Sequence, residues 1–202
     1  MNLFYKEKKI TNHRNVFSLL ALNKPKGVIC SHNDEKNRKK IYDLIPKNIN
    51  RMIKGSLHSV GRLDFNSQGL ILLTNNTKIK AYLEKPSSKI IRVYKVKIQG
   101  IISDSILKKV NKGTFINEKF YSIIKIEILK KTKSYSWLLV KLNEGKNQHI
   151  RKVFKRFGYS VNKLIRIQYG PYKIGPLRSG EIKFLNINKL KLKYYDNNSR
   201  LT

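Results

Sequence analysis

One carboxylate in this sequence is placed where it could do chemistry. Asp64 follows Arg62 by two residues, on a segment that lies between Gly61 and Gly69. The apolar run 70–73 is too short for a core helix and predicts a buried strand, so Asp64 should lie on a loop between two strands. Nearby positive charge favours the ionised form of a carboxylate, which can then act as a nucleophile or a base.

Asp64 also has a second interpretation that local chemistry leaves open. Aspartate is an ordinary loop residue, and a turn or cap residue paired with Arg62 would look the same in the sequence. The choice between a structural and a catalytic carboxylate therefore depends on what the rest of the chain brings to this loop.

The overall charge indicates a polyanionic partner. The 202 residues include 44 Lys plus Arg and only 12 Asp plus Glu, a formal net charge of +32. Such a balance favours nucleic acid first and an anionic membrane second. However, 34 of the 44 basic residues are lysine, and a composition bias could produce that excess without a functional demand. The positions of the arginines therefore carry more information than the total charge.

Several classes of protein are disfavoured by the composition. Cys30 is the single cysteine, which excludes an internal disulfide and a cysteine-rich metal site. No apolar stretch approaches the roughly 20 residues of a membrane span, and the N-terminus lacks the apolar core of a secretory signal. No sequence motif for a metal or a nucleotide cofactor is present. We expect a cytoplasmic protein that needs no cofactor and no metal.

Two further stretches contain residues that could bind RNA or a base. Residues 23–27 read NKPKG, a proline turn in which Lys24 and Lys26 could contact phosphates or could belong to a plain surface turn. Residues 90–100 alternate as in a half-buried strand, which places Tyr94 on the apolar face. On this pattern alone, Tyr94 is a core tyrosine.

The C-terminal half contains a basic helix and a strand with polar residues on one face. Apolar residues at helical spacing after Gln148 predict a helix whose other side carries Arg151 and Lys152, next to a turn with Lys146 and Asn147. Basic residues at such a turn can hold phosphates. The strand predicted for 161–170 places Leu164 and Arg166 on a shared face, although Leu164 taken singly fits the core.

Taken together, these segments resemble the RsuA-type rRNA pseudouridine synthases. The run GRLDFNSQGLILLTNN is similar to the active-site pattern GRLDxxSxGLLLLTND of that family. NKPKG resembles its NKPxG motif, VYKVKI its KxYxV motif and EGKNQHIRKVF its EGRNRQIRRM motif, and VNKLIRIQYGP resembles its closing segment. The resemblance extends from about residue 20 to residue 187.

The resemblance implies isomerisation of a flipped-out uridine in RNA to pseudouridine, without a cofactor. It implies that Asp64 is the catalytic carboxylate and that Arg62 or Arg166 holds this carboxylate. It implies that Tyr94 lies against the target base and assists proton transfer, and that Leu164 lines the base pocket. The residues that we expect to contact the RNA around this pocket are Lys24, Lys26, Lys146, Asn147, Arg151 and Lys152.

The sequence departs from the family pattern in places that matter for RNA binding. Lys146, Gln148 and His149 stand where the family has two arginines and a glutamine, which removes bidentate phosphate contacts. We expect His149 to contact RNA or to pack, without a catalytic role. These changes keep open an alternative, a non-catalytic RNA-binding or ribosome-associated protein that retains the fold.

The expected architecture is α+β: a mixed, mainly antiparallel bent sheet with flanking helices, in two halves around a central cleft. We expect a basic arm at 1–17, the catalytic domain at 18–188 and a polar tail at 189–202, without the S4-type domain typical of the family. The expected substrate is a loop or single-stranded uridine in structured rRNA. The closing segments resemble members that act on large-subunit, 23S-type rRNA. We also expect a monomer that meets ribosomal assembly intermediates.

Overall fold

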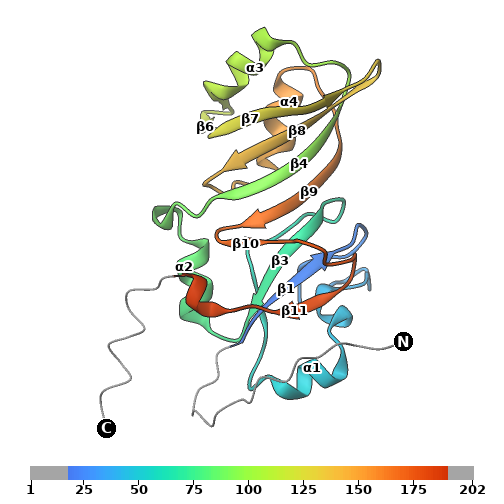
Figure 1. The fold of residues 1–202 in the computed structure, drawn as a ribbon, viewed down its shortest axis with the longest axis vertical. Helices are drawn as coiled ribbons and strands as arrows, with labels where there is room; N and C mark the ends of the chain where they lie inside the picture. The colour runs from blue at the N-terminus through green and yellow to red at the C-terminus, as the bar shows by residue number, and fades with distance from the viewer. Residues whose placement is uncertain (1–17, 191–202) are drawn as a thin grey trace.

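The computed structural model describes residues 18–190, which fold around one long bent sheet. The strands follow the order β11-β1-β3-β9-β4-β8-β7, with β2 beside β3 and β10 beside β9 (Figure 1). All neighbours pair antiparallel except β3 and β9. The prediction of a mixed, mainly antiparallel sheet is therefore confirmed. The strands are β1 (Leu19–Lys24), β2 (His58–Val60), β3 (Gln68–Thr74), β4 (Arg92–Gln99), β7 (Lys125–Lys131), β8 (Tyr135–Leu142), β9 (Val161–Tyr169), β10 (Tyr172–Lys173) and β11 (Ile182–Phe184).

The sheet has two halves that meet at a short parallel contact (Figure 1). One half contains β1, β2, β3 and β11, and the other contains β4, β7, β8 and β9. The junction consists of the pairs Gln68↔Ile165 and Gly69↔Arg166. A separate hairpin is formed by β5 (Thr114–Ile116) and β6 (Lys119–Tyr121).

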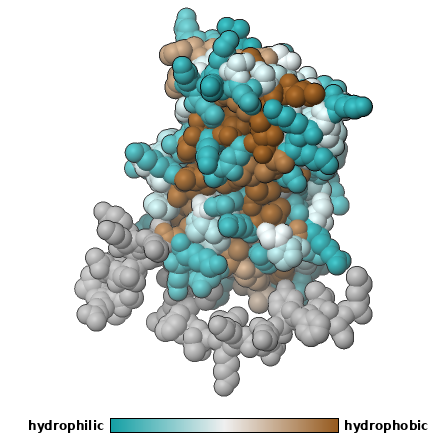
Figure 2. Space-filling model, turned by 45° about the horizontal axis from the view of Figure 1, so that its top comes forward, coloured by the Kyte–Doolittle hydropathy of each residue, from teal (hydrophilic) through white to brown (hydrophobic). Residues whose placement is uncertain are grey.

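Apolar patterning explains the position of each strand. In β3, all residues after Gln68 are buried, as expected for a strand covered on both faces. In β8, buried residues alternate with half-buried ones, so one face enters the core and the other remains partly open. Figure 1 shows α4 behind β7 and β8. In Figure 2 the top of the molecule is turned toward the viewer, and apolar side chains on the visible face are bordered by hydrophilic ones. Trp137 lies on the half-open face of β8, and Lys95 Nζ is 5.0 Å from its ring centroid.

Four α-helices and three short 3₁₀ turns are found in residues 18–190. The helices are α1 (Lys47–Met52), α2 (Thr77–Glu84), α3 (Asp104–Asn111) and α4 (His149–Arg156), with short 3₁₀ turns at Ile41–Leu44, Pro86–Ser88 and Ile187–Leu190. Ser103 caps α3 by accepting a bond from the Ile106 N–H. Asn76 caps α2, because its side chain accepts a bond from the Ile79 N–H at 3.0 Å.

The predicted terminal segments fall largely outside the described residues. The basic arm at 1–17 is entirely outside them, as is the proposed tail from residue 191 onward. The tail was expected to start at 189, but the last 3₁₀ turn continues to Leu190, whose side chain is buried in the smaller apolar cluster. Leu190 therefore packs with the described fold.

Gly69 is the position where the two halves approach most closely. Its φ is +104°, and a Cβ atom there would lie 2.3 Å from the Arg166 carbonyl oxygen and 2.7 Å from the Arg166 nitrogen. Neither backbone atom can move without shifting β9. Glycine is thus required here both by conformation and by space.

We predict that Gly69→Ala destabilises the protein more than Gly158→Ala does. Gly158 also has a positive φ, +83°, but a Cβ atom there would meet nothing within 4 Å. The control should lose only the conformational term, about 1–2 kcal/mol. The Gly69 variant should lose about 1–3 kcal/mol more because of the added overlap. Urea unfolding of both variants measures the difference, and equal losses would show that the close approach is not limiting.

Candidate active site

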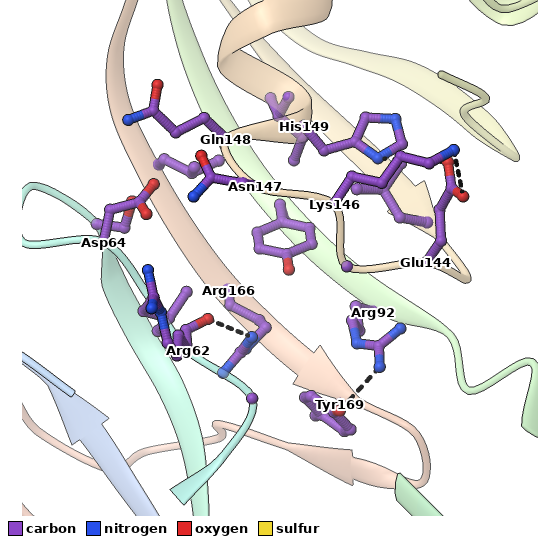
Figure 3. Close-up of a pocket in the computed structure, with 18 of the residues that line it drawn as sticks. Arg62, Asp64, Arg92, Glu144, Lys146, Asn147, Gln148, His149, Arg166 and Tyr169 are labelled. Carbon is purple, nitrogen blue, oxygen red and sulfur yellow. Dashed lines mark hydrogen bonds and ion pairs between the residues drawn. The ribbon is translucent and has the colours of Figure 1, made fainter. Parts of the chain in front are cut away.

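The loop between β2 and β3 carries Asp64 into a cavity at the junction of the two halves. The cavity encloses about 580 Å³, within the range of small-ligand pockets. Figure 3 shows Asp64 and Arg62 on one side, the segment from Glu144 to His149 on the opposite side, and Arg166 and Tyr169 between them. The predicted site residues that line the cavity are Arg62, Asp64, Tyr94, Lys146, Asn147, Leu164 and Arg166.

Sheet register explains why residues far apart in the sequence meet here. Tyr94 on β4 pairs with Arg166 on β9, and Val96 pairs with Leu164. Cross-strand partners share a face of the sheet, so Tyr94, Leu164 and Arg166 all face the cavity. The exposed fractions of these side chains are 8%, 6% and 2%. The register shift between Val93 and Tyr94 sets this pairing.

The turn that carries Asp64 is tied to the core by Lys24. The Lys24 Nζ donates to the carbonyl oxygens of Ser67 at 2.8 Å and Pro25 at 3.0 Å, and its side chain is fully buried. Burial lowers the pKa of Lys24 to about 8. The Ser67 N–H also donates to the Asp64 carbonyl at 2.9 Å, which closes the turn. Lys24 thus positions the turn, and the prediction that it contacts phosphate is wrong, because its ammonium group does not reach solvent.

Arg166 connects the two halves beneath the Asp64 loop. Its Nε donates to the Leu70 carbonyl at 2.7 Å and its Nη1 to the Arg62 carbonyl at 3.4 Å (Figure 3). Its Nη2 is buried and has no partner in the part of the chain that the structure describes. The expected ion pair of Asp64 with Arg62 or Arg166 does not form within residues 18–190. Both arginines instead lie beside a carboxylate whose oxygens remain available to a substrate.

Arg92 and Tyr169 also line the cavity, and the sequence gave no reason to select Tyr169. The Arg92 Nη2 donates to the Tyr169 hydroxyl at 2.9 Å, and this hydroxyl donates to the Leu83 carbonyl at 3.0 Å. The guanidinium carbons of Arg92 and Arg166 lie 4.8 and 5.0 Å from the Tyr169 ring centroid. These contacts lower the cost of burying two cations. Arg92 could have been selected from the sequence as the basic residue two positions before Tyr94. Its burial could not, because it depends on contacts with Asn143 and Tyr169, which are far along the chain.

The segment before α4 closes the cavity with residues that neutralise one another. The Lys146 Nζ is 2.8 Å from Glu144 Oε2 and also donates to the Phe120 carbonyl. Gln148 has a φ of +50° and precedes the first helical residue, His149. The ammonium group of Lys146 is therefore already engaged by Glu144 and Phe120, so it is less available to bind a phosphate than the sequence suggested.

The remaining predicted RNA contacts lie outside this cavity. Lys26 is exposed but lines no part of it, and Lys152 lies 6.0 Å from the Tyr121 ring. Arg151 donates to the carbonyls of Val161 at 2.8 Å and Asn66 at 3.5 Å, so its guanidinium group supports the end of the Asp64 loop. The structure therefore brings together the predicted catalytic residues and separates several of the predicted phosphate contacts from them.

Three carboxylates line this cavity, but Glu84 pairs with Lys80 and Glu144 pairs with Lys146. Within residues 18–190, Asp64 is the one of the three that forms no ion pair. Among residues 18–190, no cluster of three or more His, Cys, Asp and Glu side chains could hold a metal ion. No helix in this range is long and apolar enough to span a membrane. Asp64 can act as a nucleophile or base on a ring that stacks within the pocket.

His149 is buried beside this site and has an acid-sensitive environment. Only 4% of its surface is exposed, and its ring meets the Tyr121 ring edge-on at 5.0 Å. Burial lowers the pKa of His149 to about 4, although Glu144 opposes the shift. Of the two roles expected for His149, packing describes its position in the structure.

We predict that His149→Gln removes part of the acid sensitivity of folding. Because the pKa of His149 is lower in the folded state, the unfolded state binds a proton there more readily. The stability that depends on neutral His149 is therefore complete above pH 6.5 and is lost as the pH falls toward 4. Wild type should lose about 2 kcal/mol relative to the glutamine variant across this window. Urea unfolding at pH 7, 5.5 and 4 tests this, and a constant difference between the proteins would contradict it.

The chain is similar to known RNA pseudouridine synthases. The sequence profile of the RNA pseudouridylate synthase family matches residues 18–156. A Rickettsia felis protein named uncharacterized RNA pseudouridine synthase is 44% identical over 167 residues, which cover 83% of this chain and 69% of that protein. Ribosomal large subunit pseudouridine synthase B of Buchnera aphidicola subsp. Baizongia pistaciae is 36% identical over 152 residues, covering 75% of this chain and 60% of the relative.

Solved structures show the same fold. A crystal structure of a pseudouridylate synthase superposes with a TM-score of 0.73 at 22% identity, covering 87% of this chain and 73% of the other. The fold, the extent of the profile match and the identity to the Rickettsia protein lead to one assignment. The chain belongs to the RNA pseudouridine synthase family, and it is an enzyme that acts on RNA.

Proposed function

We propose that the chain converts one specific uridine of large-subunit rRNA to pseudouridine, with Asp64 as the catalytic carboxylate. The observation that carries this proposal is the convergence of Asp64, Tyr94, Leu164 and Arg166 on one cavity from three separate segments. The rRNA substrate is supported by the names of the Buchnera relatives, which are ribosomal large subunit enzymes. The catalytic unit would span residues 18–188.

The reaction is a balanced isomerisation that needs no external reagent. The glycosidic bond from N1 of uracil to the sugar breaks, the uracil turns, and C5 bonds to the same sugar carbon. C5 loses its proton when it bonds to the sugar and N1 gains one, so the product has the same atoms as the substrate. Asp64 starts this sequence by adding to the sugar or base, or by assisting glycosidic cleavage.

The neighbouring residues have complementary roles in this proposal. The target base must leave its helix stack, at a cost of a few kcal/mol. Tyr94 would stack on the uracil and take part in proton transfer at the sugar, and Leu164 would form the pocket wall. Arg166 has an unpartnered buried Nη2 beside this space, which suits it to hold the Asp64 carboxylate once RNA excludes water. Arg62 is the second candidate for that contact.

The cellular setting follows from the substrate. A uridine in a loop or single-stranded region of structured rRNA is easier to extract than a paired one. We propose a cytoplasmic monomer that acts on rRNA or on ribosomal assembly intermediates, with basic residues on the rim holding backbone phosphates.

We predict that Asp64→Asn retains RNA binding and makes no pseudouridine. The amide preserves the shape of the side chain but cannot act as a nucleophile or base. The matched control is Asp104→Asn, because Asp104 is exposed on α3, away from the cavity. Pseudouridine mapping of total rRNA from cells that carry each variant measures the result.

One rRNA site should be lost with Asp64→Asn and kept with Asp104→Asn. Turnover by Asp64→Asn would remove the catalytic assignment. If wild type modifies no rRNA site, mapping of tRNA decides whether the substrate is another RNA or whether the chain only binds RNA.

A further inference from the structure

A second cavity opens on the other side of the Asp64 loop. It encloses about 970 Å³, and its inner end shares Arg62, Leu63, Asp64 and Gln148 with the catalytic pocket. Its outer walls come from the segment 29–42, from β2 and from the residues just after Asp64. We call this cavity the flanking groove. The two cavities meet at Asp64, so they form one path with the carboxylate at its midpoint.

A pair of stacked rings forms one wall of the flanking groove. The His32 and Tyr42 ring centroids are 3.8 Å apart, with an interplanar angle of 16°. The Tyr42 hydroxyl accepts a bond from the Ser59 N–H on β2 at 3.2 Å, which fixes the inner ring. His32 is the outer ring and is exposed, and His58 approaches it edge-on at 6.0 Å. The outer face of the His32 ring is therefore open to a further stacked ring, while its inner face is held by Tyr42.

The groove has a net positive lining. Arg38 pairs with Asp34 and lies 5.7 Å from the Phe65 ring centroid, so the charge of Asp34 is compensated. The guanidinium group of Arg62 is exposed and makes no hydrogen bond or ion pair to any residue of 18–190. Phe65 is 40% exposed although it is apolar. Exposed rings beside an uncommitted arginine are the combination that binds an unpaired base and its phosphate.

Chain connectivity indicates what occupies this groove. A uridine that enters the catalytic pocket remains covalently linked to its neighbours, and those neighbours must lie where the pocket opens. We propose, on the basis of the function proposed above, that the flanking groove binds an unpaired nucleotide next to the target uridine. Its base stacks on His32, and its phosphate lies toward Arg62. Stacking tolerates any base, so the groove selects for unpaired RNA beside the target rather than for one sequence.

The binding test uses a fluorescein-labelled pentaribonucleotide with one central uridine between cytidines, and every protein carries Asp64→Asn to prevent turnover. His32→Ala should weaken binding roughly tenfold, as expected for the loss of one base–ring stack. His32→Phe keeps a ring and should bind as the parent does. Phe65→Ala and Phe184→Ala form a matched pair, since both phenylalanines are 40% exposed and only Phe65 lines the groove. Phe65→Ala should weaken binding, and Phe184→Ala should not.

An abasic nucleotide on one side of the uridine separates direct stacking from an indirect effect. It should weaken binding to the parent about tenfold and should cause no further loss in His32→Ala, because the contact is already absent. An equal loss in both proteins, or unchanged affinity of His32→Ala, overturns the groove assignment.

Activity distinguishes this inference from the proposed function. In an enzyme that retains Asp64, His32→Ala should lower kcat/KM on rRNA, whereas Asp64→Asn alone should abolish product. If wild type is active and His32→Ala has the same kcat/KM, the groove assignment is overturned and the proposed function stands. Absence of product from wild type removes the proposed function, and the abasic test then still decides whether the groove holds a base.

Discussion

The rest of this structure depends on one backbone contact, the approach of Gly69 to Arg166. The two halves of the sheet are joined in parallel through only two residue pairs, Gln68↔Ile165 and Gly69↔Arg166. A side chain at position 69 would overlap with the Arg166 backbone. This contact brings the loop that carries Asp64 next to β9. Asp64 thus lines one cavity with Leu164 on β9 and Tyr94 on the adjacent strand β4. The position of the active site is therefore a consequence of how the halves are joined.

Three buried cations surround that junction, and each is satisfied mainly by backbone carbonyls. Lys24 binds the Ser67 carbonyl, Arg166 binds the Leu70 carbonyl, and Arg92 binds the Asn143 carbonyl. Carbonyl partners compensate desolvation without neutralising the charge. These cations therefore keep their positive charge at the junction, which favours a polyanionic ligand. The ordinary arrangement of pairing each cation with an acid would neutralise that charge.

The sequence predicted the elements well because their patterns are local. The apolar run at 70–73, the alternation at 92–99 and the helical spacing after Gln148 each depend on a few neighbouring residues. Placement of Tyr94, Leu164 and Arg166 on inward faces follows from the same alternation. Their meeting in one cavity does not, because it depends on the pairing of β4 with β9 and on the register shift before Tyr94. The expectation that these residues share one site came from the family resemblance, because periodicity gives only the face of each strand.

The errors share a physical origin in long polar side chains. Lysine in a proline turn is normally solvated, so burial of Lys24 required knowledge that the Ser67 turn lies above β1. An arginine two residues from an aspartate suggests an ion pair, but Arg62 uses its backbone carbonyl to hold Arg166 while its side chain stays exposed. In each case the sequence gives the residue type, and the tertiary contact decides which of its groups is used.

The same loop explains why one carboxylate can serve both chemistry and substrate placement. Residues 61–67 separate the catalytic pocket from the flanking groove, and Arg62 and Asp64 line both cavities. In the proposals above, the target base and the adjacent base lie on opposite sides of this loop, so the RNA strand would bend at Asp64. The backbone anchors of the loop, Lys24 and Arg166, resist displacement when the strand bends. With the loop held in this way, the proposed mechanism would require the RNA, rather than the protein, to take up the distortion that exposes the uridine.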